Sequence, residues 1–192
     1  MRSFAITELL SQTRTQKLGI LLFGCLTALT ARITVDLPFT PVPITLQVLS
    51  VLLAGLVLGA QAGAASQMLY LVASAVGLPL SARGLGGLAA FLSPTAGYLL
   101  AFIPATFIVG WLARFWGQHR FVSQFIASLA GVLVIYLGGT AWLAMWTQGG
   151  LITAWQLGAM PFIWIDGVKA ILAALAARSG RALLTTEYER GR

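Results

Sequence analysis

The sequence is poor in charged residues, which make up only 9% of its 192 residues, against roughly 25% in an average soluble domain. Hydrophobic residues account for 58%. This balance excludes an ordinary soluble domain and predicts an all-α integral membrane protein. At about 20 residues per span, the length allows about six transmembrane helices. Residues 1–192 are therefore expected to form a single membrane domain with no separate soluble part.

Cysteine and histidine are also scarce, since Cys25 and His119 are the only residues of their kinds. A single cysteine excludes a disulfide framework and a cysteine metal site. His119, beside Arg120, is interpreted as a solvated loop residue. No second acidic residue lies at membrane depth for a protease dyad, and no serine or cysteine lies near a plausible base. The sequence predicts no enzymatic activity, no metal and no cofactor.

The formal net charge is +7, but the arginines flank apolar runs and form no dense stripe of the kind that binds nucleic acid. They are interpreted as charges that orient the chain in the membrane. Only Arg32 and Arg83 fall on one side of the predicted spans. The other side carries Arg2, Arg14, Lys17, Arg114, Arg120, Arg178, Arg181, Arg190 and Arg192. This asymmetry predicts a multi-pass plasma-membrane protein with both termini in the cytoplasm.

The apolar runs predict six membrane-spanning helices, at about residues 17–35, 44–58, 64–76, 95–115, 121–146 and 161–178. Residues 17–178 would form a six-helix bundle. Residues 1–16 are expected to form an interfacial helix on the cytoplasmic side. Residues 179–192 are expected to be a charged cytoplasmic tail. Gly55, Gly59 and Gly63 are spaced as small residues are at close helix contacts in lipid, which predicts tight packing of the second and third spans.

Two connections on the outer side are predicted to be irregular. Residues 36–43 contain three prolines, which remove hydrogen-bond donors and favour extended backbone. Residues 77–94 are rich in glycine and apolar for a loop. Irregular backbone at such depth persists where protein buries it or where it lines a cavity. The second connection is therefore expected to be a plug or lid over an outward-facing pocket.

Asp166 and Lys169 lie three positions apart in the last predicted span, so they share one helix face and can touch. An ionisable residue inside a bilayer costs roughly 2.5 to 3.5 kcal/mol unless it is paired or wetted. The pair is either a structural clasp or part of a substrate site, where the carboxylate accepts ligand N–H groups and the ammonium donates to ligand oxygens. Gly167 beside it would let a ligand or helix approach closely. An independent secondary transporter is not favoured, because no inverted repeat relates the two halves.

Six short motifs occur in order along the chain: PVPITLQ at 41–47, LAGLVLG at 53–59, GLP at 77–79, GG at 86–87, SPTAGY at 93–98 and PFIWIDGVKA at 161–170. Together they resemble the biotin-specific S components of energy-coupling factor transporters, over about residues 20–178. This resemblance implies the six-helix S-component fold. It also implies a subunit that captures biotin from outside with high affinity, for delivery across the membrane by an ATP-driven module.

The resemblance further implies partners: a transmembrane coupling subunit and two cytoplasmic ATPases, which alone would use ATP. It assigns ligand contacts to Asp166 and Lys169, and the matching motifs add Gln47, Tyr98 and Gly86. The family often has a small polar residue before its glycine pair, where this chain has Leu85. Arg83 would then be either a substitute contact or an orienting charge.

On the first helix, Gly24 and Ala28 match the small-residue surface that meets the coupling subunit; packing within the chain is the other interpretation. Two alternatives to biotin capture stay open. One is an S component for another vitamin. The other is a structural membrane protein in which Asp166 and Lys169 only hold the bundle together.

Overall fold

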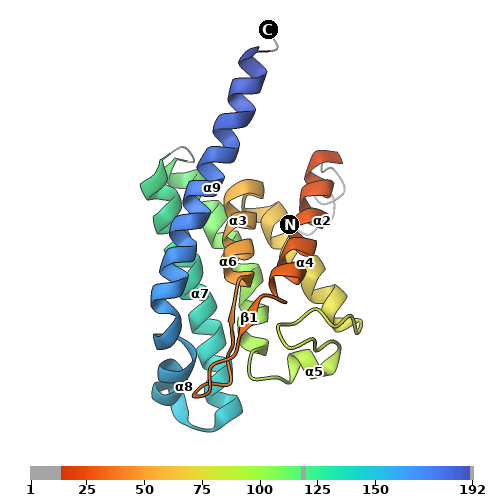
Figure 1. Ribbon diagram of the computed structural model, residues 1–192, viewed down its shortest axis with the longest axis vertical. Coiled ribbons are helices and arrows are strands. Elements are labelled where there is room, and N and C mark those ends of the chain that lie inside the picture. The colour runs from red at the N-terminus through yellow and green to blue at the C-terminus, as the bar shows by residue number, and fades with distance from the viewer. Residues whose placement is uncertain (1–13, 118–119, 191–192) are drawn as a thin grey trace, which may run out of the picture.

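The computed structural model describes residues 14–117 and 120–190, which form a bundle of helices with one short hairpin (Figure 1). The predicted interfacial segment 1–16 lies outside the described residues except at its end, where Arg14 begins α2. The helices are α2 (Arg14–Thr30), α3 (Gln47–Leu58), α4 (Ala60–Ala75), α5 (Leu88–Phe91), α6 (Ala96–Trp116), α7 (Phe121–Thr147), α8 (Gly150–Gly158) and α9 (Ile163–Arg190). A 3₁₀ turn, η1 (Met160–Phe162), joins α8 to α9.

Three helical stretches in the described chain are long and apolar enough to cross a membrane: Ala96–Trp116, Phe121–Thr147 and Gly150–Ser179. The chain is therefore a multi-pass helical membrane protein. The predicted fourth and fifth spans agree closely with α6 and α7. α2, with 17 residues, and α3, with 12, are shorter than the predicted first and second spans, whereas α4 has 16 residues and begins earlier than the predicted third span. Membrane crossing by these three does not follow from length alone.

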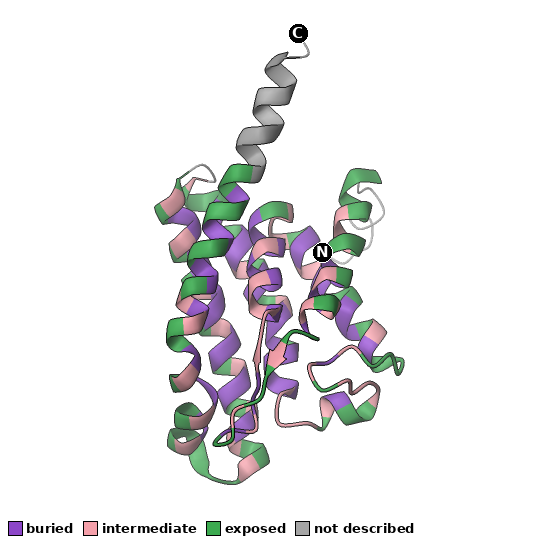
Figure 2. Ribbon diagram, viewed as in Figure 1, coloured by how far each residue is buried: buried purple, intermediate pink, exposed green. Residues whose placement is uncertain are grey.

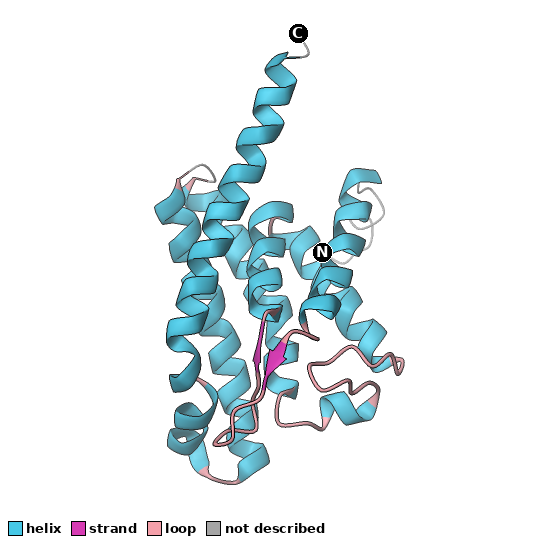
Figure 3. Cartoon of the chain, in the orientation of Figure 1, coloured by secondary structure: helices cyan, strands magenta, loops and turns pink. Residues whose placement is uncertain are grey.

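An all-helical chain was expected, but two short strands interrupt it between α2 and α3 (Figure 3). β1 (Thr34–Val35) pairs antiparallel with β2 (Ile44–Thr45), with Thr34 opposite Thr45. The predicted first span therefore ends early, and the second begins at Gln47 rather than Ile44. The three prolines between the strands explain the change, because they deny the segment the N–H donors that a helix needs.

The glycine-rich connection 77–94 is anchored to other segments at several points. Gly87 N donates to the Ser74 carbonyl at 2.7 Å, and Trp142 Nε1 donates to the Ser93 carbonyl at 2.9 Å. The Arg32 guanidinium donates to the Pro79 carbonyl. Arg83 forms an ion pair with Asp36 at 3.3 Å. Much of this irregular backbone thus has partners within the chain, as its depth requires, and it includes the short helix α5.

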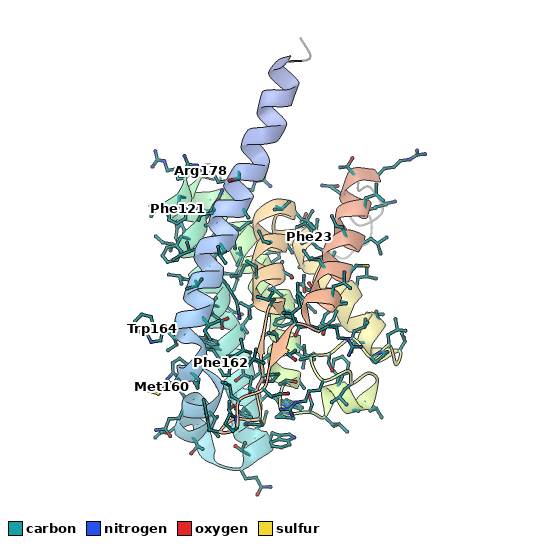
Figure 4. All side chains as sticks on the ribbon, in the orientation of Figure 1. Phe23, Phe121, Met160, Phe162, Trp164 and Arg178 are labelled. Carbon is teal, nitrogen blue, oxygen red and sulfur yellow. The ribbon has the colours of Figure 1, made fainter. Side chains whose placement is uncertain are left out.

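α9 begins beside the hairpin end of the bundle and continues as helix to Arg190 (Figure 1). The predicted last span ended at Arg178, whereas the helix continues without a break into the segment 179–192 that was predicted to be a charged cytoplasmic tail. One face of α9 is buried in the bundle through a row of small residues: Ala170, Ala173, Ala174 and Ala177. Trp164 points away from the bundle, whereas Phe162 just before α9 points inward (Figure 4).

Close helix contacts in the bundle rest on glycines, and buried residues line the inward faces of the helices (Figure 2). A Cβ at Gly97 of α6 would meet Trp142 Cβ and lie 2.5 Å from the Gly138 carbonyl oxygen of α7. Gly55 packs against α6 rather than α4, since a Cβ added at this position would lie 2.7 Å from the Thr106 carbonyl oxygen. The expected tight packing of spans two and three through Gly55, Gly59 and Gly63 is thus partly redirected to α6. Gly59, with φ of 82°, forms the turn between α3 and α4.

The glycine contacts give a prediction on stability. Gly97→Ala should destabilise the protein by about 1–3 kcal/mol, because the added methyl overpacks the α6–α7 contact. Gly167→Ala is the matched control, since nothing lies within 4 Å of a Cβ at that helical position, and alanine is a better helix former than glycine. Thermal unfolding in detergent should show a lower midpoint for Gly97→Ala only. Equal midpoints for the two variants would contradict the packing account.

Candidate functional site

A cavity opens among the hairpin, α3, α6, α7 and the start of α9, with about 570 Å³ of empty space including its mouth. Apolar side chains form most of the wall, among them Leu99, Phe102, Ile135 and Phe162. A few polar groups interrupt this wall, as in many small-molecule sites. The polar and charged side chains that line it are Thr45, Gln47, Thr95, Tyr98, Tyr136, Asp166 and Lys169.

Asp166 and Lys169 form a buried ion pair at the cavity wall. Lys169 Nζ donates to Asp166 Oδ1 at 2.6 Å, and the exposed fraction is 6% for the Lys169 side chain and 5% for the Asp166 side chain. They lie in the first turns of α9 at positions i and i+3, so the helix itself holds them together. Among the described lining residues they are the only acid and the only base. The cavity is therefore locally neutral but carries both signs of charge.

Tyr136 of α7 completes the pair by donating from its hydroxyl to Asp166 Oδ2 at 2.7 Å. Both carboxylate oxygens thus have a donor, although each has a further lone pair for a ligand. The Tyr136 ring packs edge-on against Trp155 of α8, with 6.3 Å between ring centroids. Tyr136 is the important residue that sequence reasoning missed. Its only signal was a tyrosine within the long apolar run of α7, where other polar residues such as Gln124 and Thr140 occur as well.

Tyr98 of α6 lines the cavity from a slot between two glycines. Its hydroxyl donates to the Gly158 carbonyl at 2.9 Å, at the end of α8. A Cβ on Gly139 or on Gly158 would collide with the tyrosine. The two glycines are therefore required for the ring to lie where it does, and Tyr98 links α6 to α8 beside the cavity.

Gln47, the first residue of α3, lines the cavity on the side of the hairpin. Its backbone N–H donates to Thr45 Oγ1 at 3.3 Å, and its side-chain Nε2 donates to the Tyr70 hydroxyl at 2.9 Å. Tyr70 lies on α4, is fully buried and does not line the cavity. The start of α3 is thus fixed from both its backbone and its side chain.

The structure brings together Gln47, Tyr98, Asp166 and Lys169 around one cavity, but it does not bring Arg83 or Gly86 to the wall. Arg83 points to Asp36 in an exposed ion pair. Gly86 permits a close approach within the loop, because a Cβ there would collide with the Leu78 and Gly77 carbonyl oxygens. The glycine-rich connection contributes Ala82 to the wall instead.

The two residues predicted to meet a coupling subunit differ in their surroundings. Gly24 is buried, and a Cβ there would lie 3.2 Å from the Ser66 carbonyl oxygen of α4. That contact is the packing interpretation within the chain. Ala28 is half-buried beside the core.

The lining residues have the composition of a small-molecule binding site. The described lining residues include no histidine, no cysteine and no second carboxylate, so they offer no nucleophile–base pair of the usual kinds. In the part of the chain that the structure describes, no cluster of His, Cys, Asp and Glu could hold a metal ion. A neutral pair with unused donors and acceptors at an apolar wall can bind a small molecule that has an apolar body and polar ends.

Comparison with known proteins places this geometry in a family. A model of the BioY family matches residues 7–186. The "Probable biotin transporter BioY" of Pyrococcus horikoshii is 46% identical over 158 residues, covering 82% of this chain and 91% of that protein. The "Biotin transporter BioY" of Rhizobium etli is 41% identical over 175 residues, covering 87% and 92%.

The fold agrees with a solved structure as well. A crystal structure of "the S-component for biotin from an ECF-type ABC transporter" superposes with a TM-score of 0.80. It is 28% identical in sequence, and the match covers 90% of this chain and 95% of that one. With a family match over most of its length and close relatives on both sequence and fold, the chain belongs to the BioY family.

Proposed function

We propose that this protein is the high-affinity biotin-binding subunit of a vitamin uptake transporter. The observation that carries the proposal is the buried Asp166–Lys169 pair, which faces a cavity instead of being enclosed by helices. A pair that only fixed the bundle would need no cavity beside it. Family membership adds that the relatives with this fold are described as biotin transporters.

The chemistry of biotin suits the cavity. Its ureido ring offers N–H donors and a carbonyl acceptor, its tail ends in a carboxylate, and its ring body and chain are apolar. Asp166 and Gln47 can accept N–H groups, and Lys169 can donate to a carbonyl or carboxylate. Tyr98 adds a hydroxyl at the wall. The walls at Leu99, Phe102 and Ile135 suit the apolar body.

Removing either charge should weaken biotin binding sharply. Asp166→Asn and Lys169→Met each leave a buried charge without its partner, and truncating one member of such a pair costs about 2–5 kcal/mol, or about 30-fold or more in affinity. Asp36→Asn is the matched control, because Asp36 belongs to an exposed pair that contributes about 0–1 kcal/mol. Binding of labelled biotin to the purified protein measures all three.

The outcomes separate the alternatives. A wild type that does not bind biotin at sub-micromolar concentration would refute the biotin assignment, and other vitamins would then be tried on the same preparation. Variants that bind like the wild type but unfold at lower temperature would make the pair a structural clasp. Biotin that is chemically altered during the assay would contradict the proposal that the protein has no catalysis of its own and needs no cofactor.

We propose six membrane crossings, by α2, α3, α4, α6, α7 and α9. Three of these helices are short, and α3, at about 1.5 Å per residue, covers only part of a core about 30 Å thick. The hairpin continues from its N-terminal end along the cavity, where irregular backbone is tolerated. The start of α2, Phe121 at the start of α7, and Arg178 lie at the end of the bundle opposite the hairpin (Figures 1 and 4). That end carries most of the positive charge and would face the cytoplasm.

Cysteine labelling tests this orientation. In a Cys25→Ser background, Phe39→Cys places a thiol on the exposed hairpin and Arg120→Cys places one at the opposite end. A membrane-impermeant maleimide should label Phe39→Cys in intact cells and Arg120→Cys only after permeabilisation. The reverse pattern would show that the cavity opens inward.

Delivery of biotin across the membrane should depend on partner subunits. We propose a transmembrane coupling subunit and two cytoplasmic ATPases, with docking on the face of α2 that carries Gly24 and Ala28. Gly24 would act indirectly there, by holding α2 close to α4. Cells without other biotin uptake should accumulate labelled biotin when this chain is expressed with those subunits. An inactive ATPase variant is the control, and equal accumulation with it would show that the chain transports without ATP.

A further inference from the structure

A buried tyrosine outside the cavity determines which atom Gln47 can offer to a ligand. The Tyr70 hydroxyl donates to the Leu80 carbonyl at 3.3 Å. A carbonyl oxygen can only accept a hydrogen bond, so this bond uses the single proton of the phenol. Towards Gln47 the Tyr70 oxygen can therefore act only as an acceptor.

The amide of Gln47 is oriented by this constraint. Its Nε2 must face Tyr70, at 2.9 Å, because only the nitrogen carries protons to donate. The amide oxygen then points away from Tyr70. Since Gln47 lines the cavity and Tyr70 does not, Oε1 remains as the acceptor that the amide presents to a bound molecule.

We propose that Tyr70 is a positioning residue for ligand recognition, which makes Gln47 an acceptor for a ligand N–H group. A freely rotating amide would present its oxygen and its nitrogen equally, and would not distinguish a ligand donor from a ligand acceptor. This inference rests on the proposed biotin site, whose ligand carries ureido N–H donors. Tyr70 acts entirely through Gln47 and touches no ligand itself.

Tyr70 also joins two parts of the wall that are distant in sequence. Leu80 precedes Ala82, the residue of the glycine-rich connection that lines the cavity, and Gln47 lies at the start of α3. Loss of the hydroxyl could act on either part. A double-mutant cycle separates them, because residues that work through one contact are non-additive whereas independent effects add.

Biotin affinity should be measured for the wild type, Tyr70→Phe, Gln47→Ala and the double variant. Tyr70→Phe keeps the buried ring and should bind about five- to tenfold more weakly, as expected for one lost hydrogen bond in a ligand network. Gln47→Ala should lose at least as much. The double variant should bind within about twofold of Gln47→Ala alone.

Ser50→Ala is the matched control. Ser50 lies on α3 with Gln47, is itself buried, and shares a part-buried hydrogen bond with Thr30 at 2.7 Å, but it does not line the cavity. It should lower the unfolding temperature about as much as Tyr70→Phe and leave biotin affinity unchanged. A loss of affinity in Ser50→Ala as large as that in Tyr70→Phe would show a general effect of stability and overturn the proposal.

Two further results would overturn it. One is that Tyr70→Phe binds biotin as tightly as the wild type does. The other is that Tyr70→Phe weakens binding by the same factor in the wild type and in Gln47→Ala, which would mean that Tyr70 acts through its hydrogen bond to Leu80 and not through Gln47. Both results require a wild type that binds biotin. A wild type that does not bind would refute the proposed function itself, so the two failures are distinguishable.

Discussion

The structure depends on the burial of one acid and one base within a bundle of apolar helices. Lys169 Nζ lies 2.6 Å from Asp166 Oδ1, and both side chains are almost fully buried. A buried pair recovers its desolvation cost only with good geometry and further hydrogen bonds. Helix α9 supplies the geometry through the i, i+3 spacing, and Tyr136 of α7 supplies a hydrogen bond. The pair is therefore stable only while α7 and α9 stay together.

Small residues make that contact possible. Apolar helices gain no hydrophobic free energy by leaving lipid, so their association relies on close packing and hydrogen bonds. The inward face of α9 is a row of buried alanines, and glycines let α6 approach α7 within the reach of Tyr98. At Gly139 and Gly158 this close approach also holds Tyr98 at the cavity wall. The same small residues that stabilise the bundle thus also determine the shape of the site.

Part of the fold and of the site could be predicted from the sequence, namely where an apolar run was long or where burying a charge in lipid would be costly. The long apolar runs predicted α6 and α7, and the cost of charge in lipid predicted a special role for Asp166 and Lys169. Tyr136 could not be identified, because nothing in its neighbours shows that it faces Asp166, which lies 30 positions further along the chain. Arg83 was ambiguous for the same reason, since its partner Asp36 lies 47 positions earlier in the chain and meets it only in the folded loops. The strands were missed because two residues each are too few to show an alternating pattern.

The cavity lies where the helices are interrupted, and this location has a physical reason. A broken helix leaves backbone groups without helical partners, and lipid cannot satisfy them. Where α8 ends, the Gly158 carbonyl accepts from Tyr98; where α3 begins, the Gln47 N–H donates to Thr45. At both breaks a residue of the cavity wall supplies the missing partner. The backbone irregularities and the polar groups of the site therefore require one another, and a bundle of six uninterrupted helices would have neither.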